Sequence, residues 1–163
     1  MKYVTATDGS VSLVSPKDYA YLQNFVWRVD VKGYFCARSS RLRMNRVVAE
    51  RAGMDMSGPI DHKNRNKADN RRSNLRPATN GKNRANSKLN ANSKSGFKGV
   101  HLRKRRDRIS NRKVRSDCLG NRWTAQINVN GKKLWLGDFP TPEEAHAAYA
   151  QAARKHFGEF ASP

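Results

Sequence analysis

The sequence predicts an α+β protein built from small modules, and three observations support this. Near the C-terminus, two alternating apolar segments flank an Asn-Gly pair and are followed by a helix pattern. The first half carries short strand patterns separated by helical ones. Hydrophobic residues make up only 37% of the 163 residues, so we do not expect one large core.

The N-terminal part is predicted to form short strands around two helical segments. The expected elements are strands at 11–14, 25–29 and 34–37, a helical turn at 16–24 and a helix at 43–52. Gly53 is expected to end the second helix. Trp27, Phe25 and Leu22 are the candidate core residues.

A β-hairpin is predicted around Asn130-Gly131, the preferred pair for a two-residue type I′ turn. The turn fixes the register on either side. The expected pairs are Val129 with Lys132, Asn128 with Lys133, Ile127 with Leu134, Gln126 with Trp135, and Ala125 with Leu136. Apolar side chains then share one face, and polar side chains with Trp135 share the other.

A helix follows the hairpin. Thr141 is expected to be its N-cap, Pro142 its first residue and Glu144 the closing member of a capping box, with Gly158 at its end. Its small apolar face is Ala145, Ala148, Tyr149, Ala152 and Ala153. This face can lie against the apolar face of the hairpin and leave the polar face exposed, either as a solvated surface or as one that fits a DNA groove.

The charge is concentrated in the middle of the chain. The formal net charge is +20, and 19 of the 33 Lys and Arg lie between His62 and Ser116, against two acids. A polyanion is the expected partner, because so many like charges repel one another without one. No apolar run reaches the ~20 residues of a membrane span, and the basic residues do not lie on one face of a long amphipathic segment, so we expect no membrane partner. Cys36 and Cys118 are far apart and are expected to be reduced thiols.

Four motifs of the C-terminal part resemble a known DNA-binding family. They lie at 95–100 (SGFKGV), 122–127 (RWTAQI), 134–139 (LWLGDF) and 141–160. Residues of about 95–161 resemble the Apetala-two domain of plant ethylene-response factors. The resemblance implies a three-stranded antiparallel sheet, packed on one helix, that reads the major groove of double-stranded DNA. By position, the implied contacts are Lys98, His101, Arg103, Arg122, Gln126, Lys133 and Trp135. A basic insertion at 105–119 departs from the family pattern and is expected to bind phosphates.

The segment before it carries a second pattern. An Asp61-His62 pair ends a short strand, and a polar loop leads to an Asn74-Leu75 strand. A helix then starts at Thr79 and contains Asn83. Residues 44–86 resemble the phage homing-endonuclease branch of the HNH nucleases, which implies a ββα-metal fold.

Hydrolysis of a phosphodiester needs an activated water and stabilisation of developing charge. A neutral His suits the first task near pH 7, and a carboxylate with an amide oxygen suits Mg²⁺. The resemblance implies His62 as general base, and Asp61 and Asn83 as ligands of Mg²⁺, with Mn²⁺ as a substitute. It implies Asn74 as the amide that pins the loop and orients His62. The candidate phosphate-binding residues are Arg46, Arg71, Arg72 and Arg84.

One residue departs from the nuclease pattern. Relatives usually have Met-His-Arg where this chain has Met44-Asn45-Arg46. If that histidine supports the metal or the phosphate, Asn45 weakens the site or marks a degenerate nuclease. An amide still donates and accepts hydrogen bonds, so catalysis remains the expectation.

Together, the two resemblances predict a Mg²⁺-dependent, site-directed endonuclease of the homing type, encoded by a phage or mobile element and acting in the cytoplasm of a bacterial host. The nuclease is expected at 1–85 and a flexible linker at 86–95. The DNA-binding domain of the Apetala-two type, called the reader below, is expected at 96–163. One site per chain predicts nicking by a monomer, while a dimer could cut both strands. The alternatives are a catalytically degenerate DNA-binding regulator and an RNA-associated basic protein.

Overall fold

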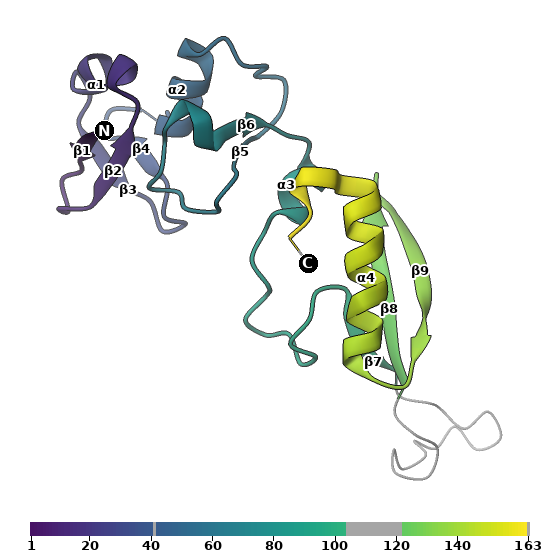
Figure 1. The fold of residues 1–163 in the computed structure, drawn as a ribbon. Helices are drawn as coiled ribbons and strands as arrows, with labels where there is room; N and C mark the ends of the chain where they lie inside the picture. Colours follow the sequence, from purple (N-terminus) through teal and green to yellow (C-terminus); the bar gives the residue numbers. More distant parts are fainter. Residues whose placement is uncertain (41, 104–121, 163) are drawn as a thin grey trace. The chain divides into compact units, whose positions relative to one another are not determined.

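The computed structural model describes residues 1–40, 42–103 and 122–162, and the chain divides into two compact units. Unit 1 is Met1–Asn83 and unit 2 is Arg84–Pro163 (Figure 1). Within the described ranges, each unit combines helices with small antiparallel sheets, so the prediction of a mixed α and β fold is confirmed. The predicted basic insertion at 105–119 lies outside the described residues.

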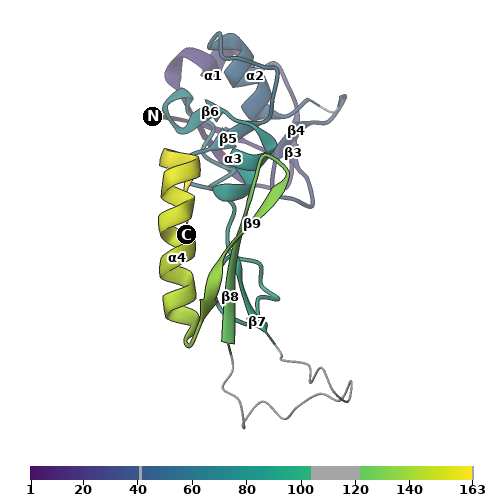
Figure 2. The same ribbon diagram turned by 90° about the vertical axis from the view of Figure 1, so that its right-hand side faces the viewer.

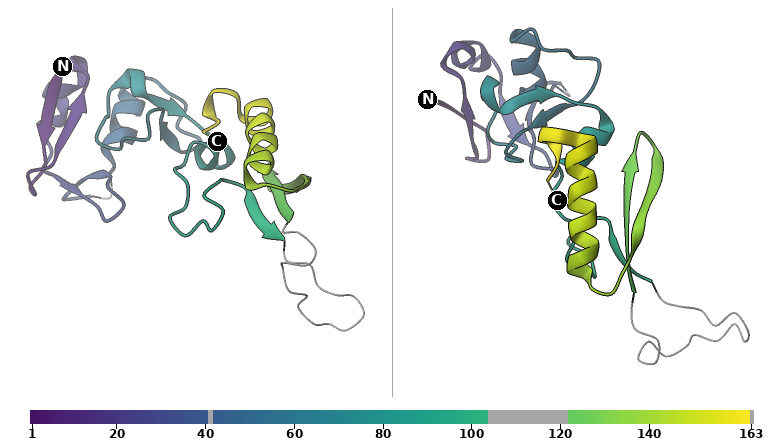
Figure 3. Two further views of the ribbon diagram at one scale, coloured as in Figure 1. Left: turned by 60° about the horizontal axis from the view of Figure 1, so that its bottom comes forward. Right: turned by 45° about the vertical axis from the view of Figure 1, so that its right-hand side comes forward.

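The described residues of unit 1 form three two-stranded antiparallel sheets. Its strands are β1 (Lys2–Thr5) with β2 (Val11–Val14), β3 (Trp27–Val29) with β4 (Phe35–Ala37), and β5 (Ile60–His62) with β6 (Leu75–Pro77). Its helices are α1 (Pro16–Leu22), α2 (Met44–Arg51), the short 3₁₀ helix η1 (Arg72–Asn74) and the first residues of α3 (Asn80–Ala85). Figure 3 shows the β1–β2 hairpin beside α1. Strand β1 was not predicted, whereas the other N-terminal elements lie within a few residues of their predicted ranges.

One apolar cluster holds unit 1 together. Trp27, Leu22, Met44 and Val48 are among its fully buried side chains, and the indole nitrogen of Trp27 donates to the carbonyl of Leu22 at 2.8 Å. Phe25 packs against this cluster at its edge. The predicted core is therefore confirmed for Trp27 and Leu22, with Phe25 only partly buried.

A buried carboxylate ties the first helix to the later part of unit 1. Asp18 on α1 is fully buried and accepts two hydrogen bonds from the Arg72 guanidinium, at 2.7 and 2.6 Å. Arg51 of α2 also reaches it, at 3.4 Å. Hydrogen bonds to charged groups are worth more than neutral ones, so Asp18 fixes α1 against both α2 and the segment that enters β6.

In unit 2, the residues that the structure describes form a three-stranded antiparallel sheet with one long helix on it. The strands β7 (Val100–Arg103), β8 (Arg122–Val129) and β9 (Lys132–Phe139) lie in the order β7-β8-β9. Helix α4 (Pro142–Phe157) runs along one face of the sheet (Figure 2) and is followed by the short η2 (Gly158–Phe160). The alanines of α4 let the helix lie close to the strands.

Neighbouring residues determine the turn between β8 and β9 and the two ends of α4. Asn130 and Gly131 have φ values of 50° and 81°, as a type I′ turn requires. Thr141 Oγ1 accepts from the backbone N–H of Glu144 at 3.2 Å, and Gly158 follows the last residue of α4 with φ 52°. Both the hairpin turn and the helix cap are as predicted.

The predicted register is wrong at one pair. Gln126 pairs with Trp135 as expected, but Ala125 pairs with Gly137 rather than with Leu136. A β-bulge between Ala125 and Gln126 leaves Leu136 as an extra residue. From Gly137 to the end of β9, the alternation of side chains between the two faces of the sheet is therefore shifted by one residue from the predicted one.

A glycine permits the close approach of α4 to the strands. Gly99 has φ 66°, and a Cβ at this position would lie 2.3 Å from Cδ2 of Tyr149 and 2.5 Å from the carbonyl oxygen of Gln126. Gly131 has a similar positive φ, but nothing lies within 4 Å of the Cβ position. Substitutions at these two positions therefore distinguish the cost of steric crowding from the cost of backbone strain.

We expect Gly99→Ala to destabilise unit 2 by at least about 3 kcal/mol, because strain and overpacking add. Gly131→Ala is the matched control and should cost only about 1 kcal/mol of strain. Urea unfolding followed by the helix signal of circular dichroism measures both. Equal losses in the two variants would contradict the packing argument.

Candidate functional site

The Asp61-His62 pair lies in a short sheet inside unit 1. Strands β5 and β6 are antiparallel, with Asp61 opposite Arg76 and His62 opposite Leu75. Both Asp61 and His62 are buried, with 5% and 4% of their surface exposed. Two titratable side chains that are adjacent in the sequence are thus both buried from solvent, where electrostatic interactions are strong.

Helix α3 follows this sheet directly. The N–H of Ala78 donates to the carbonyl of Pro59 at 2.9 Å, which extends the pairing, and Thr79 Oγ1 accepts from the N–H of Lys82 at 3.2 Å. Thr79 therefore caps α3, and half-buried Asn83 lies one turn into the helix. A strand pair followed at once by a capped helix is the local order that the sequence predicted for the candidate site.

His62 is oriented by an amide that the sequence analysis did not single out. Nε2 of His62 lies 3.1 Å from Oδ1 of Asn70. The amide nitrogen of Asn70 donates to Ser12 Oγ at 2.8 Å and to the carbonyl of Lys67 at 3.1 Å. Because the Lys67 carbonyl can only accept, the amide nitrogen of Asn70 must face it, and the amide oxygen must face the ring of His62. A neutral His62 therefore carries its proton on Nε2 and its lone pair on Nδ1.

Burial is the main cause that lowers the pKa of His62 from its ordinary value of 6.5, because it disfavours the charged imidazolium. The hydrogen bond to Asn70 and the charge of Asp61 act in the opposite direction. The net direction keeps His62 neutral near pH 7, which is the form that a general base needs.

Strand β2 holds Asn70 in place. The N–H of Asn70 donates to the carbonyl of Leu13, and the N–H of Leu13 donates to the carbonyl of Ala68, both at 2.8 Å. Ser12 Oγ donates to the same Ala68 carbonyl at 3.1 Å. The N-terminal hairpin is thus part of the support of His62. No local signal marked Asn70, since the strand β2 residues that hold it, Ser12 and Leu13, lie almost sixty residues earlier in the chain.

Asn74 organises the loop between β5 and β6. Its Oδ1 accepts from the N–H of Asn64 at 3.1 Å, and its Nδ2 donates to Asn64 Oδ1 at 3.0 Å and to the carbonyl of Asp69 at 2.7 Å. These bonds close the loop on itself. Contact with the ring of His62 comes from Asn70 instead.

Asp61 forms a buried ion pair. Its Oδ2 lies 3.0 Å from Nε of Arg76, and both side chains are less than a tenth exposed. An ionised carboxylate has about four lone-pair sites, so an ion pair with Arg76 is compatible with a metal on the same group. Within the described ranges, no three His, Cys, Asp or Glu side chains group together as metal ligands. The ligands that the sequence resemblance implies, the Asp61 carboxylate and the Asn83 amide with water, are of a type that Mg²⁺ accepts.

Asn45 is buried beside this sheet. Its Nδ2 donates to the carbonyl of Ile60 at 3.2 Å, immediately before Asp61. Its Oδ1 is buried, and no donor of the described residues reaches it. An unsatisfied buried acceptor costs about 1–3 kcal/mol. Asn45 therefore supports β5 through one end of its amide and leaves the other end open to a donor or a cation.

Two of the candidate phosphate-binding arginines are held by carboxylates. Arg71 binds both oxygens of Asp69, at 2.8 and 2.7 Å, and Arg72 binds Asp18 as described above. The Arg71 guanidinium is the main cause that lowers the pKa of Asp69. Both arginines are about one-third exposed, so their contacts are structural while part of each guanidinium still faces solvent.

The other two arginines differ from each other. Arg46 donates to the carbonyls of Gly58 at 3.1 Å and Met56 at 3.3 Å, and so holds the segment that leads into β5. Arg84 is exposed on α3 next to Asn83. Of the four candidates, Arg84 is thus the one whose position is set by the helix of the candidate site alone.

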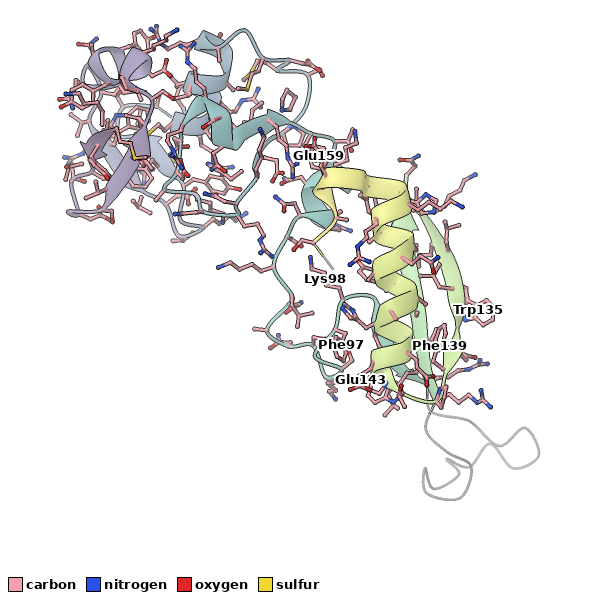
Figure 4. All side chains as sticks on the ribbon, in the orientation of Figure 1. Phe97, Lys98, Trp135, Phe139, Glu143 and Glu159 are labelled. Carbon is pink, nitrogen blue, oxygen red and sulfur yellow. The ribbon has the colours of Figure 1, made fainter. Side chains whose placement is uncertain are left out.

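The outer face of the unit 2 sheet carries most of the residues nominated for DNA contact. Trp135 is 67% exposed and points away from α4 (Figure 4), and Gln126 is its cross-strand partner. Exposed residues on the strands are His101, Arg103, Arg122 and Lys133. Arg103 is ion-paired with Asp138. An exposed aromatic ring among cations gives this face the chemistry of a nucleic-acid surface.

Lys98 has a different position from the other nominated residues. Its ammonium group donates to the carbonyl of Ala85 at 3.1 Å and to the carbonyl of Ser162. Ala85 is the last residue of α3, and Ser162 is the last described residue. These contacts give Lys98 a structural role in unit 2.

Comparisons with known proteins find two kinds of similarity. Dehydration-responsive element-binding protein 2A of Arabidopsis thaliana is 45% identical over 56 residues, which is 33% of this chain and 16% of that protein. The protein of the same name from indica rice (Oryza sativa) is 41% identical over 81 residues, or 47% of this chain and 29% of the relative. An uncharacterized HNH endonuclease of Acanthamoeba polyphaga mimivirus is 27% identical over 161 residues, or 95% of this chain and 75% of the relative.

The chain is thus similar to a DNA-binding protein of the Apetala-two type and, more weakly but over nearly its full length, to a viral HNH endonuclease. It spans less than a third of the length of the plant relatives. No family model and no solved structure matches it. Among the helices within 1–40, 42–103 and 122–162, none is long and apolar enough to cross a membrane.

The Asn70 contact predicts how His62 titrates. In the wild type, NMR titration should place the pKa of His62 below 6.5, because burial dominates. Asn70→Asp puts a carboxylate at the same ring nitrogen and should raise that pKa, because the negative charge favours the imidazolium. Asn66→Asp, an exposed change in the same loop, is the control. Equal shifts in the two variants would show that Asn70 does not act on the ring directly.

Proposed function

We propose that this protein is a metal-dependent endonuclease that cuts phosphodiester bonds in double-stranded DNA. The observation that carries the proposal is the buried, neutral His62, oriented by Asn70 and adjacent to the Asp61 carboxylate. The near full-length similarity to an HNH endonuclease supports the same reading. We further propose a homing-type enzyme of a phage or mobile element, active in the bacterial cytoplasm.

His62 is the proposed general base. Its lone pair lies on Nδ1 in the neutral tautomer that Asn70 favours, so a water at that nitrogen would lose its proton as it attacks the phosphorus. Asn70 prevents the ring from turning. Asn74 contributes by closing the loop that carries Asn70. The exposed Arg84 is the proposed phosphate contact on α3.

Asp61 and Asn83 are the proposed ligands of Mg²⁺ or Mn²⁺. Arg76 fixes the Asp61 carboxylate by its buried ion pair, and α3 sets the position of Asn83. When bound, the metal would stabilise the charge that develops on the phosphate and on the leaving oxygen. The buried Oδ1 of Asn45 lies on the helix beside β5 and fits a polar, cation-tolerant site.

The proposed DNA-reading surface is the outer face of the unit 2 sheet, where Trp135, Gln126 and Lys133 lie together. Similarity to dehydration-responsive element-binding proteins supports DNA as the partner. The described part of the chain carries one site of this kind, so we propose that the protein nicks one strand as a monomer.

The second candidate function is a DNA-binding protein without nuclease activity. Asn45, in place of the histidine of the nuclease pattern, favours it. Both candidates share the reader and differ only in cleavage, so one assay separates them.

Supercoiled plasmid at low salt should be nicked in the presence of Mg²⁺ or Mn²⁺ and remain intact with EDTA. His62→Ala should slow nicking by at least about 100-fold, because a general base contributes that much. DNA binding by the variant, measured by gel shift, should persist. His156→Ala removes an exposed imidazole from α4 and should have no effect.

Intact plasmid, and then intact candidate host or phage genomes, would favour the regulator if the wild type is folded and binds DNA. A stable dimer on DNA that cuts both strands, seen by sedimentation, would overturn nicking by a monomer.

Asn45→His tests the departure from the nuclease pattern. We expect the variant to nick DNA at least as fast as the wild type, because an imidazole N–H can keep the bond to Ile60 and no amide oxygen is left buried without a donor. Asn45→Ala, which loses the bond to Ile60, is the control and should be slower. A clear loss of nicking in Asn45→His would show that Asn45 has its own role.

A further inference from the structure

Two cations lie over one aromatic ring close to His62. Cζ of Arg43 is 4.3 Å, and Nζ of Lys67 is 4.4 Å, from the centre of the Tyr34 ring. Both distances are within the range of cation–π contacts. We call these three residues the Tyr34 platform. None of them was a candidate site residue in the sequence, because they come from three separate segments.

The platform is next to the proposed base. The ring centres of Tyr34 and His62 are 6.1 Å apart. The carbonyl of Lys67 accepts from Asn70, the residue that orients His62. Burial is the main cause that lowers the pKa of His62, and the charge of Lys67 acts in the same direction. The backbone of Lys67 thus supports the base while its ammonium group lies over Tyr34.

The turn between β3 and β4 holds the platform in position. Oδ1 of Asp30 accepts from the N–H of Lys32 at 2.8 Å and from that of Tyr34 at 2.9 Å. Its Oδ2 pairs with Arg43 at 3.3 Å. Although burial raises the pKa of Asp30, the two N–H groups and Arg43 lower it overall, so the carboxylate stays charged. One side chain therefore fixes both the ring and one of its cations.

The charge of the platform is not balanced. Asp30 offsets Arg43, but the contacts of the Lys67 ammonium among the described residues are neutral: the carbonyl of Lys32 at 2.5 Å and the Tyr34 ring. An ammonium group has three donors, and Lys67 and Tyr34 are only partly buried. The platform can therefore bind an anion from solvent.

We propose that the Tyr34 platform is a binding subsite for a backbone phosphate of double-stranded DNA beside the phosphate that is cut. The inference rests on the proposed function for the location of the cut phosphate. Lys67 supplies the main charge, Arg43 a planar set of donors, and Tyr34 the surface that keeps both cations extended. Their rigid mounting lowers the entropy lost when the phosphate binds.

The test is the salt dependence of DNA binding, measured by fluorescence anisotropy on a labelled duplex with EDTA. All variants are made in the His62→Ala background, so that no cleavage contributes. Lys67→Met should reduce the slope of log affinity against log salt by about 0.9, as expected for one lost phosphate contact. Arg43→Met should act in the same direction. Tyr34→Leu should reproduce the loss, whereas Tyr34→Phe, which keeps the ring, should not.

Lys17→Met removes the same charge from an exposed position on α1 and is the matched control. A slope in Lys67→Met equal to that of Lys17→Met would overturn the subsite, as would equal slopes in Tyr34→Leu and Tyr34→Phe when both are folded by circular dichroism. The readout does not depend on cleavage. Failure of nicking by the wild type with an altered slope would refute the nuclease alone, and nicking with an unchanged slope would refute the subsite alone.

Discussion

The arrangement of the candidate site depends on the side-chain amide of Asn70. This one group joins the ring of His62 to strand β2 and to the backbone of Lys67, and it is almost completely buried. Each of its polar atoms has a partner, which is the condition under which a buried polar network stabilises one arrangement. The N-terminal hairpin, the loop after β5 and the proposed base are therefore positioned together rather than independently.

Acids are scarce in this chain, with 13 Asp and Glu against 33 Lys and Arg, and four of them hold unit 1 together. In unit 1, Asp18, Asp30, Asp61 and Asp69 each bind an arginine. These pairs hold α1, the β3–β4 turn, β5 and the following loop. The arginines that they engage are partly or wholly committed to the fold, so the total basic charge overstates the number of side chains that point outward to bind a polyanion.

The sequence predicts best where structure is decided locally. The turn at Asn130-Gly131 and the cap at Thr141 follow from neighbouring residues, and both are present. The bulge at Ala125 is missed because it shifts strand pairing without any change in the hydrophobic pattern at that residue. Asn70 stands among several asparagines of one loop, and only its contact with distant Ser12 distinguishes it. The pairing of arginines with acids is likewise decided by the tertiary fold.

Helix α3 has a consequence for how such proteins can exchange parts during evolution. Its candidate metal ligand Asn83 is the last residue of unit 1, while the carbonyl of Ala85, two residues later, is bound by Lys98 inside unit 2. A recombination event that joined a new reader within the polar stretch after Asn86 would remove Lys98, which binds the carbonyl of the buried Ala85. Inheritance of the reader together with the end of this helix is therefore favoured over exchange at the stretch that composition alone marks as a junction.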